Sequence, residues 1–315
     1  MTSSRKIIFH GKVHDVSERE EDSSKAAKEI AAKNKKARVK LFFEGHCIGQ
    51  QIPKERRKKF AFEPTPIERR EILDFEILVS CALILNKTGI RRKIPQIVQR
   101  GERERRYAQI IQEDFDEDFE NRSLDHMLSN FGKFTNEEIG DISKALGENG
   151  YIIQPVLRRI IKAKLEQIKT DQVRFQMQQL REFFQKKKLG EIPEIDLEYQ
   201  RVYRELRFLE PKGNADPIKV AFMLNDALEE AQVIREAQIA RSIIEADFDM
   251  GILNIGLGHI ETGRIEKWLR EMGVETESDP KTNKLKYEMK ELFEKNKRKE
   301  GELEKLRREF YQDLI

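Results

Sequence analysis

Both ends of this chain carry the same short pattern: an apolar run, then Gly-x-x-His, then the start of a helix. Near the N-terminus the pattern reads "IIFHGKVH" and ends at His14, and near the C-terminus it reads "NIGLGH" and ends at His259. An apolar run that stops at a glycine, here Gly11 and Gly256, is typical of a short buried strand. Each glycine lets the backbone turn sharply where the strand ends. Ligands of parallel sheets gather at the carboxyl ends of strands, so we expect the two motifs to meet and form one polar site.

The segments around these motifs predict strands and helices in alternation. The β-branched and aromatic residues of 6–10 and 37–45 predict two strands. Between them, residues 17–36 begin with serine and acidic residues and end with lysines, which predicts a helix. A strand, a helix and a strand in this order form a βαβ unit with parallel strands. Towards the other end, 217–247 predicts a long helix and 250–259 a strand.

Amphipathic helices dominate the middle of the chain, where apolar residues recur three and four positions apart. We therefore predict an α/β fold whose parallel sheet is built from both ends of the chain, residues 1–62 plus 215–278. Residues 63–214 are predicted to be a large all-α insertion or cap. Residues 279–315 predict a charged helix that is broken or weakened at Gly301. The sequence leaves open whether this helix packs on the core or pairs with another subunit.

The charge and composition of the chain restrict the kinds of partner that we expect this protein to bind. Lys and Arg number 60 and Asp and Glu 57, giving a net charge of +3, far from the excess typical of a nucleic-acid-binding protein. Basic residues cluster at 53–60 and 90–106, but these clusters lack interleaved aromatic residues for base stacking. The apolar stretch 75–85 is shorter than the roughly 20 residues of a membrane helix, and the N-terminus has no signal-peptide pattern. Two cysteines, Cys47 and Cys81, are too few for a disulfide framework. We expect a cytoplasmic protein with neither a membrane nor a nucleic-acid partner.

Histidine is scarce in this chain and concentrated at the predicted strand ends. Only His126 lies in the helical block, and the other four are His10, His14, His46 and His259. Glu44 follows three apolar residues of the second strand, so its carboxylate is expected at the same sheet edge. Arg235 lies at the border of the apolar face of the helix 217–247, from which a planar guanidinium can reach over that edge. Taken singly, each residue is more often a surface or hydrogen-bonded side chain; their clustering favours a site.

Together these residues resemble the superfamily that groups TraB/PrgY/GumN-like proteins, Tiki metalloproteases, erythromycin esterases and ChaN-like haem-binding proteins. The family pattern has two Gly-x-x-His motifs near opposite ends of the domain, a Glu after the second strand and an Arg in the helix before the last strand. The matching residues are Gly11, His14, Glu44, Arg235, Gly256 and His259. Arg235 is followed by an acidic residue, as in the family. The resemblance covers about 5–62 and 217–275, and His46 is not part of it.

The resemblance implies a hydrolase that cleaves a peptide or ester bond in a small-molecule or peptide substrate. In a metal-dependent version, His14, Glu44 and His259 hold Mn, Co, Zn or Fe, with His46 as an extra candidate ligand. In a metal-free version, one His acts as a general base oriented by Glu44. In both, Arg235 steadies an oxyanion or a substrate carboxylate.

Two other interpretations remain. The site could bind haem, a metal or a peptide in a non-catalytic regulatory protein. The chain could also be a helical interaction protein in which the histidines have no common function.

Overall fold

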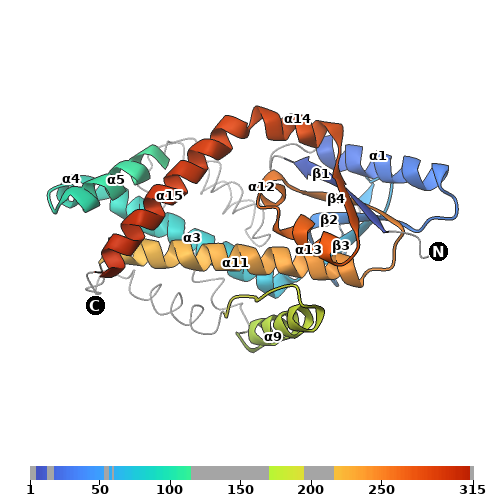
Figure 1. Cartoon of the computed structure of the whole chain (residues 1–315), viewed down its shortest axis with the longest axis horizontal. Helices are drawn as coiled ribbons and strands as arrows, with labels where there is room; N and C mark the ends of the chain where they lie inside the picture. Colours follow the sequence, from blue (N-terminus) through green and yellow to red (C-terminus); the bar gives the residue numbers. More distant parts are fainter. Residues whose placement is uncertain are drawn as a thin grey trace. The chain divides into compact units, whose positions relative to one another are not determined.

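The computed structural model describes residues 5–12, 18–52, 57–58, 60–114, 170–194 and 216–312 (Figure 1). The chain divides into two compact units. The first comprises Met1–Leu73, Thr170–Pro193 and Gln232–Leu292, and the second Asp74–Lys169, Glu194–Ala231 and Phe293–Ile315. Every residue predicted for the site falls within the first unit.

The first unit contains a five-stranded parallel sheet in the order β3-β2-β4-β1-β5. The strands are β1 (Lys6–Lys12), β2 (Val39–Cys47), β3 (Pro64–Glu68), β4 (Met250–Gly256) and β5 (Glu275–Ser278). Strands from the two ends of the chain lie side by side, β1 and β2 in blue and β4 in orange (Figure 1). The predicted α/β fold, with a parallel sheet built from both ends of the chain, is therefore confirmed.

The strand register brings the two Gly-x-x-His motifs together. β4 lies between β1 and β2 and pairs with both in parallel. Gly11 pairs with Ile255, and Lys12 pairs with Gly256. The two motifs thus begin on neighbouring strands, one residue apart in register, although about 245 residues separate them in sequence.

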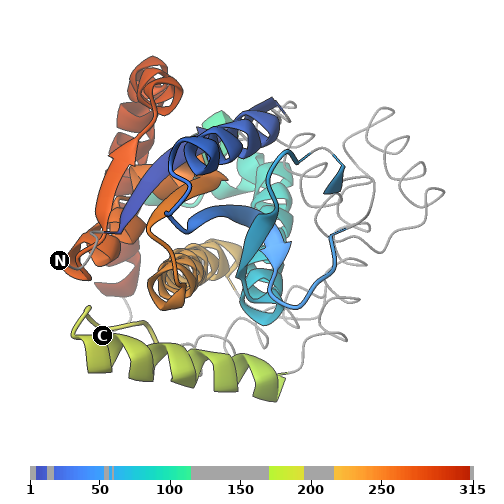
Figure 2. The ribbon, with the colours of Figure 1, turned by 90° about the vertical axis from the view of Figure 1, so that its right-hand side faces the viewer.

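Each face of the sheet is covered by different helices (Figure 2). The helix α1 (Glu18–Lys33) covers one face, where Ala27 packs on Leu41 and Ile252. On the other face, the 232–245 part of α11 (Pro217–Glu245) lies against the strands, and Ser242 Oγ donates a hydrogen bond of 2.9 Å to the Ile67 carbonyl. Side chains alternate between faces along a strand, so consecutive residues of β1, β2 and β4 address different helices.

Further helices complete the second face and one edge of the unit. The helices α12 (Leu257–Glu261), α13 (Arg264–Glu271) and α14 (Pro280–Glu288) follow β4 and β5. The helix α9 (Thr170–Lys187) packs on α13 through Phe184 and Trp268, whose ring centroids are 5.0 Å apart.

The sheet differs from the sequence prediction at both edges. The strand β3 lies within the segment predicted to be wholly helical, and β5 lies between two predicted helices. The predicted strand 250–259 ends at Gly256, after which α12 begins. His259 therefore lies on a short helix immediately beyond the strand end.

The second unit has a helical core of its own. It includes residues of α3 (Arg70–Arg92), α4 (Ile94–Ile97), α5 (Glu102–Asp114), α11 and α15 (Lys290–Gln312). Tyr107, Phe222 and Phe310 stack in this core, with ring centroids 4.7 and 5.3 Å apart. The helix α15 is continuous through Gly301, so the helix that was predicted to be broken or weakened there is not broken. Within the described ranges, no helix is long and apolar enough to cross a membrane.

Candidate functional site

Glu44 lies in the second half of β2, three residues before its last residue, Cys47, and its carboxylate is buried. Strand alternation places it on the same face as Phe42, toward α11, and its side chain is only 2% exposed. Arg235 Nη2 donates to Glu44 Oε1 at 2.7 Å, and the Gly256 backbone N–H donates to Oε2 at 2.5 Å. The carboxylate thus joins the ends of β2 and β4 to α11, at the sheet edge where the sequence predicts the site.

Arg235 binds two carboxylates at once. Its Nε donates to Glu68 Oε1 at 2.6 Å, while Nη2 reaches Glu44. Glu68 is the last residue of β3 and is 1% exposed. The predicted role of Arg235 was to steady an oxyanion or a substrate carboxylate. In the structure its donors hold two protein carboxylates at neighbouring strand ends.

His259 lies between two carboxylates. Its Nε2 is 3.3 Å from Glu44 Oε1, and its Nδ1 is 2.9 Å from Glu236 Oε1. Glu236 follows Arg235 in α11 and is 1% exposed. The structure therefore brings three of the predicted site residues, Glu44, Arg235 and His259, into one buried network.

Glu236 also accepts hydrogen bonds from the residues after α12. Thr262 Oγ1 donates to Glu236 Oε2 at 3.1 Å, and Arg264 Nε donates to the same oxygen at 2.5 Å. Sequence reasoning missed Glu68, Glu236 and Arg264 as members of the network. The only signal for Glu236 was its place beside Arg235, and the other two carried none.

The network changes the protonation of its two central residues. Burial lowers the pKa of His259, but hydrogen bonds with Glu236 and Glu44 outweigh burial and raise the pKa to about 9. Burial raises the pKa of Glu44, but the Arg235 charge and the contact with His259 hold it well below its usual range. At neutral pH, His259 is therefore a cation facing ionised Glu44.

Other predicted residues have different positions. His14 and the side chain of His46 lie outside the described residues. Lys12, two residues before His14, is near the site, with Nζ 3.9 Å from Glu44 Oε2 and 5.0 Å from the centre of the Phe43 ring. Gly256 has φ −55° and precedes α12, so it needs no left-handed conformation.

Gly11 is a paired strand residue rather than a turn. A Cβ placed there would lie 3.0 Å from side-chain atoms of Leu257, Ile260 and Thr282. The glycine therefore lets α12 and α14 pack closely against the end of β1.

Two of the three predicted metal ligands lie within the described residues. Glu44 and His259 offer a carboxylate and an imidazole 3.3 Å apart, a donor set that suits the predicted ions. No three His, Cys, Asp or Glu side chains form a metal-binding group within the described ranges. The third predicted ligand is His14.

A second polar cluster lies on the opposite face of the sheet. His10 Nδ1 is 3.2 Å from Ser23 Oγ, which also accepts a hydrogen bond of 2.7 Å from Asn254 Nδ2. Ser23 belongs to α1, so this cluster attaches that helix to β1 and β4. His10 is thus separated from the network around His259.

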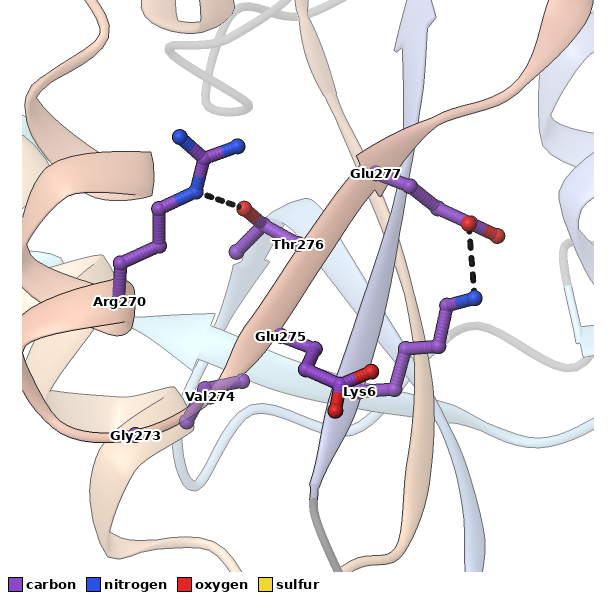
Figure 3. Close-up of a pocket in the computed structure, with 7 residues that line it drawn as sticks. All are labelled: Lys6, Arg270, Gly273, Val274, Glu275, Thr276 and Glu277. Atoms are coloured by element: carbon purple, nitrogen blue, oxygen red, sulfur yellow. Dashed lines mark hydrogen bonds and ion pairs between the residues drawn. The ribbon is translucent and has the colours of Figure 1, made fainter.

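A pocket of about 460 Å³ lies along β5 and is lined by Lys6, Arg270 and residues 273–277 (Figure 3). Lys6 begins β1, so the pocket is near the amino ends of the strands. Lys6 Nζ lies 2.7 Å from Glu277, and Arg270 Nε donates to Thr276 Oγ1 at 2.7 Å. The candidate site is at the opposite ends of the strands.

A scan against protein-family models gives no match, and comparisons with curated proteins and with solved structures give none either. The class defined by the fold and the site is therefore an α/β protein with a buried Glu–Arg–Glu and Glu–His–Glu network at the carboxyl edge of a parallel sheet.

Proposed function

We propose that this protein is a hydrolase of the TraB/Tiki/erythromycin esterase-like superfamily, acting on a peptide or ester bond of a small-molecule or peptide substrate. The observation that carries the proposal is the position of His259, whose ring nitrogens face the buried carboxylates of Glu44 and Glu236. An imidazole fixed by one carboxylate and facing a second polar group suits both proton transfer and metal ligation. The register of the two motif strands supports the same proposal.

In a metal-free mechanism, His259 supplies the proton that a leaving oxygen or nitrogen needs. Because its pKa is about 9, the imidazole is protonated at neutral pH and begins as a general acid. The water that forms the new bond to the carbonyl carbon gives its proton to the ionised carboxylate of Glu44, and the leaving group departs with the proton from His259. Glu44 then returns its proton to the neutral ring across the 3.3 Å contact between Oε1 and Nε2, which restores both groups. Glu236 holds the ring through Nδ1 and keeps Nε2 as the reactive nitrogen.

In a metal-dependent mechanism, Glu44 and His259 would be ligands of a Mn, Co, Zn or Fe ion, with His14 as the predicted third. Such an ion lowers the pKa of a bound water and polarises a carbonyl. Glu236 would orient His259 from behind the ligating nitrogen, as carboxylates commonly do for metal-bound histidines. Arg235 holds Glu44 in place.

The alternative function is a non-catalytic regulatory protein that binds a metal or a peptide at the same site. One observation favours it: Arg235 bonds Glu44 and Glu68 instead of directing those donors toward an oxyanion. Under this alternative the network stabilises the binding surface, and no substrate is turned over.

Hydrolysis of ester and peptide substrates by the full chain tests the proposal, with metal content measured by elemental analysis. His259→Gln should lower the rate by about 100-fold or more, the effect typical of losing an acid–base group. His10→Gln, which removes a histidine from the opposite face, should leave the rate within about threefold.

If Glu44 and His259 are metal ligands, we expect about one ion per chain in the wild type and a lower metal content in both E44Q and H259Q. A wild-type rate that survives in H259Q would contradict the assigned site. Ligand binding with no turnover of any ester or peptide would favour the regulatory alternative.

A further inference from the structure

Arg264 is fixed at one end of its guanidinium group. It is the first residue of α13, and its Nε donates to Glu236 Oε2 at 2.5 Å. Glu236 is buried and bonds His259 through its other oxygen. One carboxylate therefore holds both the imidazole of His259 and the guanidinium of Arg264, which places the two groups side by side.

Within the described parts of the chain, the two terminal nitrogens of the Arg264 guanidinium make no hydrogen bond or ion pair, and the side chain is 28% exposed. Arg235 is different, because its donors hold Glu44 and Glu68 and its side chain is 13% exposed. Arg270, on the same helix as Arg264, pairs through Nη2 with Glu266. Arg264 is thus an oriented guanidinium that retains its bidentate donors.

The N-cap residue of α13 is Gly263, so the positive end of the helix dipole lies beside Arg264. The backbone N–H of Arg264 donates to Thr262 Oγ1 at 3.5 Å, which leaves the guanidinium as the donor group that a ligand would meet.

We propose that the guanidinium of Arg264 binds a carboxylate of the substrate beside His259, so that the protein selects acidic substrates. The assignment rests on the proposed hydrolase for its biological meaning, but the anion site itself is testable without turnover. Arg264 is then a binding residue, and Glu236 couples its position to that of His259.

Binding of succinate to the full chain at pH 7 tests the site directly, with neutral succinamide as the matched probe. Calorimetry should show saturable binding of succinate and none of succinamide. R264Q should weaken succinate binding by about tenfold or more, the loss expected for a charge-assisted bidentate contact. R270Q removes an arginine from the same helix and should change the affinity by less than about twofold. Circular dichroism confirms that each variant is folded.

The proposal is overturned if R264Q binds succinate as the wild type does, or if the wild type shows no saturable binding. R264K provides a second test, because lysine keeps the positive charge but lacks the two parallel N–H donors of a guanidinium. It should bind succinate more weakly than the wild type and more tightly than R264Q.

Rates of ester hydrolysis distinguish an error in the proposed anion site from an error in the proposed hydrolase function. The two substrates are the mono-p-nitrophenyl ester of succinic acid and neutral p-nitrophenyl butyrate. R264Q should lose at least about tenfold more kcat/KM on the acidic ester than on the neutral one. Hydrolysis of both esters with equal losses in R264Q would keep the hydrolase and overturn the acidic selectivity. Succinate binding through Arg264 with hydrolysis of neither ester would overturn the hydrolase and keep the anion site.

Discussion

His259 and Glu236 are joined by a contact of 2.9 Å between Nδ1 and Oε1, in which a buried carboxylate holds a buried imidazole. Glu236 is next to Arg235 on α11, and the two residues bind side chains of opposite charge. Arg235 binds the carboxylates at the ends of β2 and β3, whereas Glu236 binds cationic side chains of α12 and α13. Two consecutive residues of one helix therefore connect all these elements at the carboxyl edge of the sheet.

The first prediction concerns the protonation of His259. Its ring should titrate with a pKa near 9, because Glu236 and Glu44 stabilise the imidazolium more than burial destabilises it. NMR of the ring nitrogens measures this pKa, and H259Q identifies the signal among five histidines. In E236Q the pKa should fall below that of the wild type, because one of the two anionic partners is lost. A wild-type midpoint near 6.5 would contradict the charge network.

The second prediction is the pH dependence of stability that follows from this pKa. Because the folded-state pKa lies above the unfolded value of about 6.5, the stabilisation is complete below pH 6.5 and lost as pH rises through about 9. The wild type should therefore lose roughly 2–3 kcal/mol relative to H259Q between pH 6.5 and 9. Urea unfolding of both proteins at several pH values measures the difference. Parallel curves for the two proteins would show that His259 does not change pKa on folding.

The third prediction concerns the ion pairs of Arg235. R235M should lower the free energy of unfolding by about 3–5 kcal/mol, because two buried carboxylates, Glu44 and Glu68, would lose the guanidinium that binds both of them. Lys284→Gln is the matched control, since it breaks an exposed pair with Glu288 and should cost less than about 0.5 kcal/mol. Denaturant unfolding compares them. The triple variant E44Q/E68Q/R235M should recover most of the loss, and equal costs in R235M and K284Q would refute the prediction.

The sequence predicted the parts of the fold that have an apolar pattern. The strands at 6–10 and 37–45 and the core of β4 are apolar because both faces of the sheet are covered by helices. The two edge strands have no such pattern. Residues 64–68 include Pro64 and Pro66, which suit an edge strand because it need not donate every hydrogen bond. The strand at 275–278 consists of polar residues and is defined by its backbone pairing with β1.

The site was predictable only where its residues are scarce or follow an apolar run. His259 and Glu44 satisfied these conditions, and Arg235 was a candidate because it lies at the border of the apolar face of its helix and because it matches the family pattern. Glu68 and Arg264 were missed because 37% of the residues are charged, so one more charged residue gives no sign that it will be buried or oriented. Their roles depend on which helix lies opposite each strand end, and that is a property of the tertiary fold.

The fourth prediction links Gly11 to the position of His259. G11A should destabilise the protein by about 1–3 kcal/mol, because the added methyl group lies 3.0 Å from atoms of Leu257, Ile260 and Thr282. Leu257 and Ile260 are on the same helix as His259, so the NMR signal of its ring should shift. G258A adds the same group on α12 where nothing lies within 4 Å, and it should be better tolerated. A G11A protein with wild-type stability and an unchanged His259 signal would show that the contact is not tight.

The fifth prediction compares two glycines in regular structure with opposite surroundings. Gly301 is exposed in the continuous helix α15, and a Cβ there would meet no atom within 4 Å. G301A should therefore raise the free energy of unfolding by about 0.5–1 kcal/mol, because alanine loses less backbone entropy on forming a helix.

At Gly251 in β4, a Cβ would lie 2.5 Å from Ile7 and 2.8 Å from Phe42, both fully buried. G251A should lower the free energy of unfolding by about 1–3 kcal/mol, since the added methyl group would force closely packed side chains to shift. Urea unfolding of both variants measures the two signs, and a destabilised G301A would indicate that α15 does tend to break at this glycine.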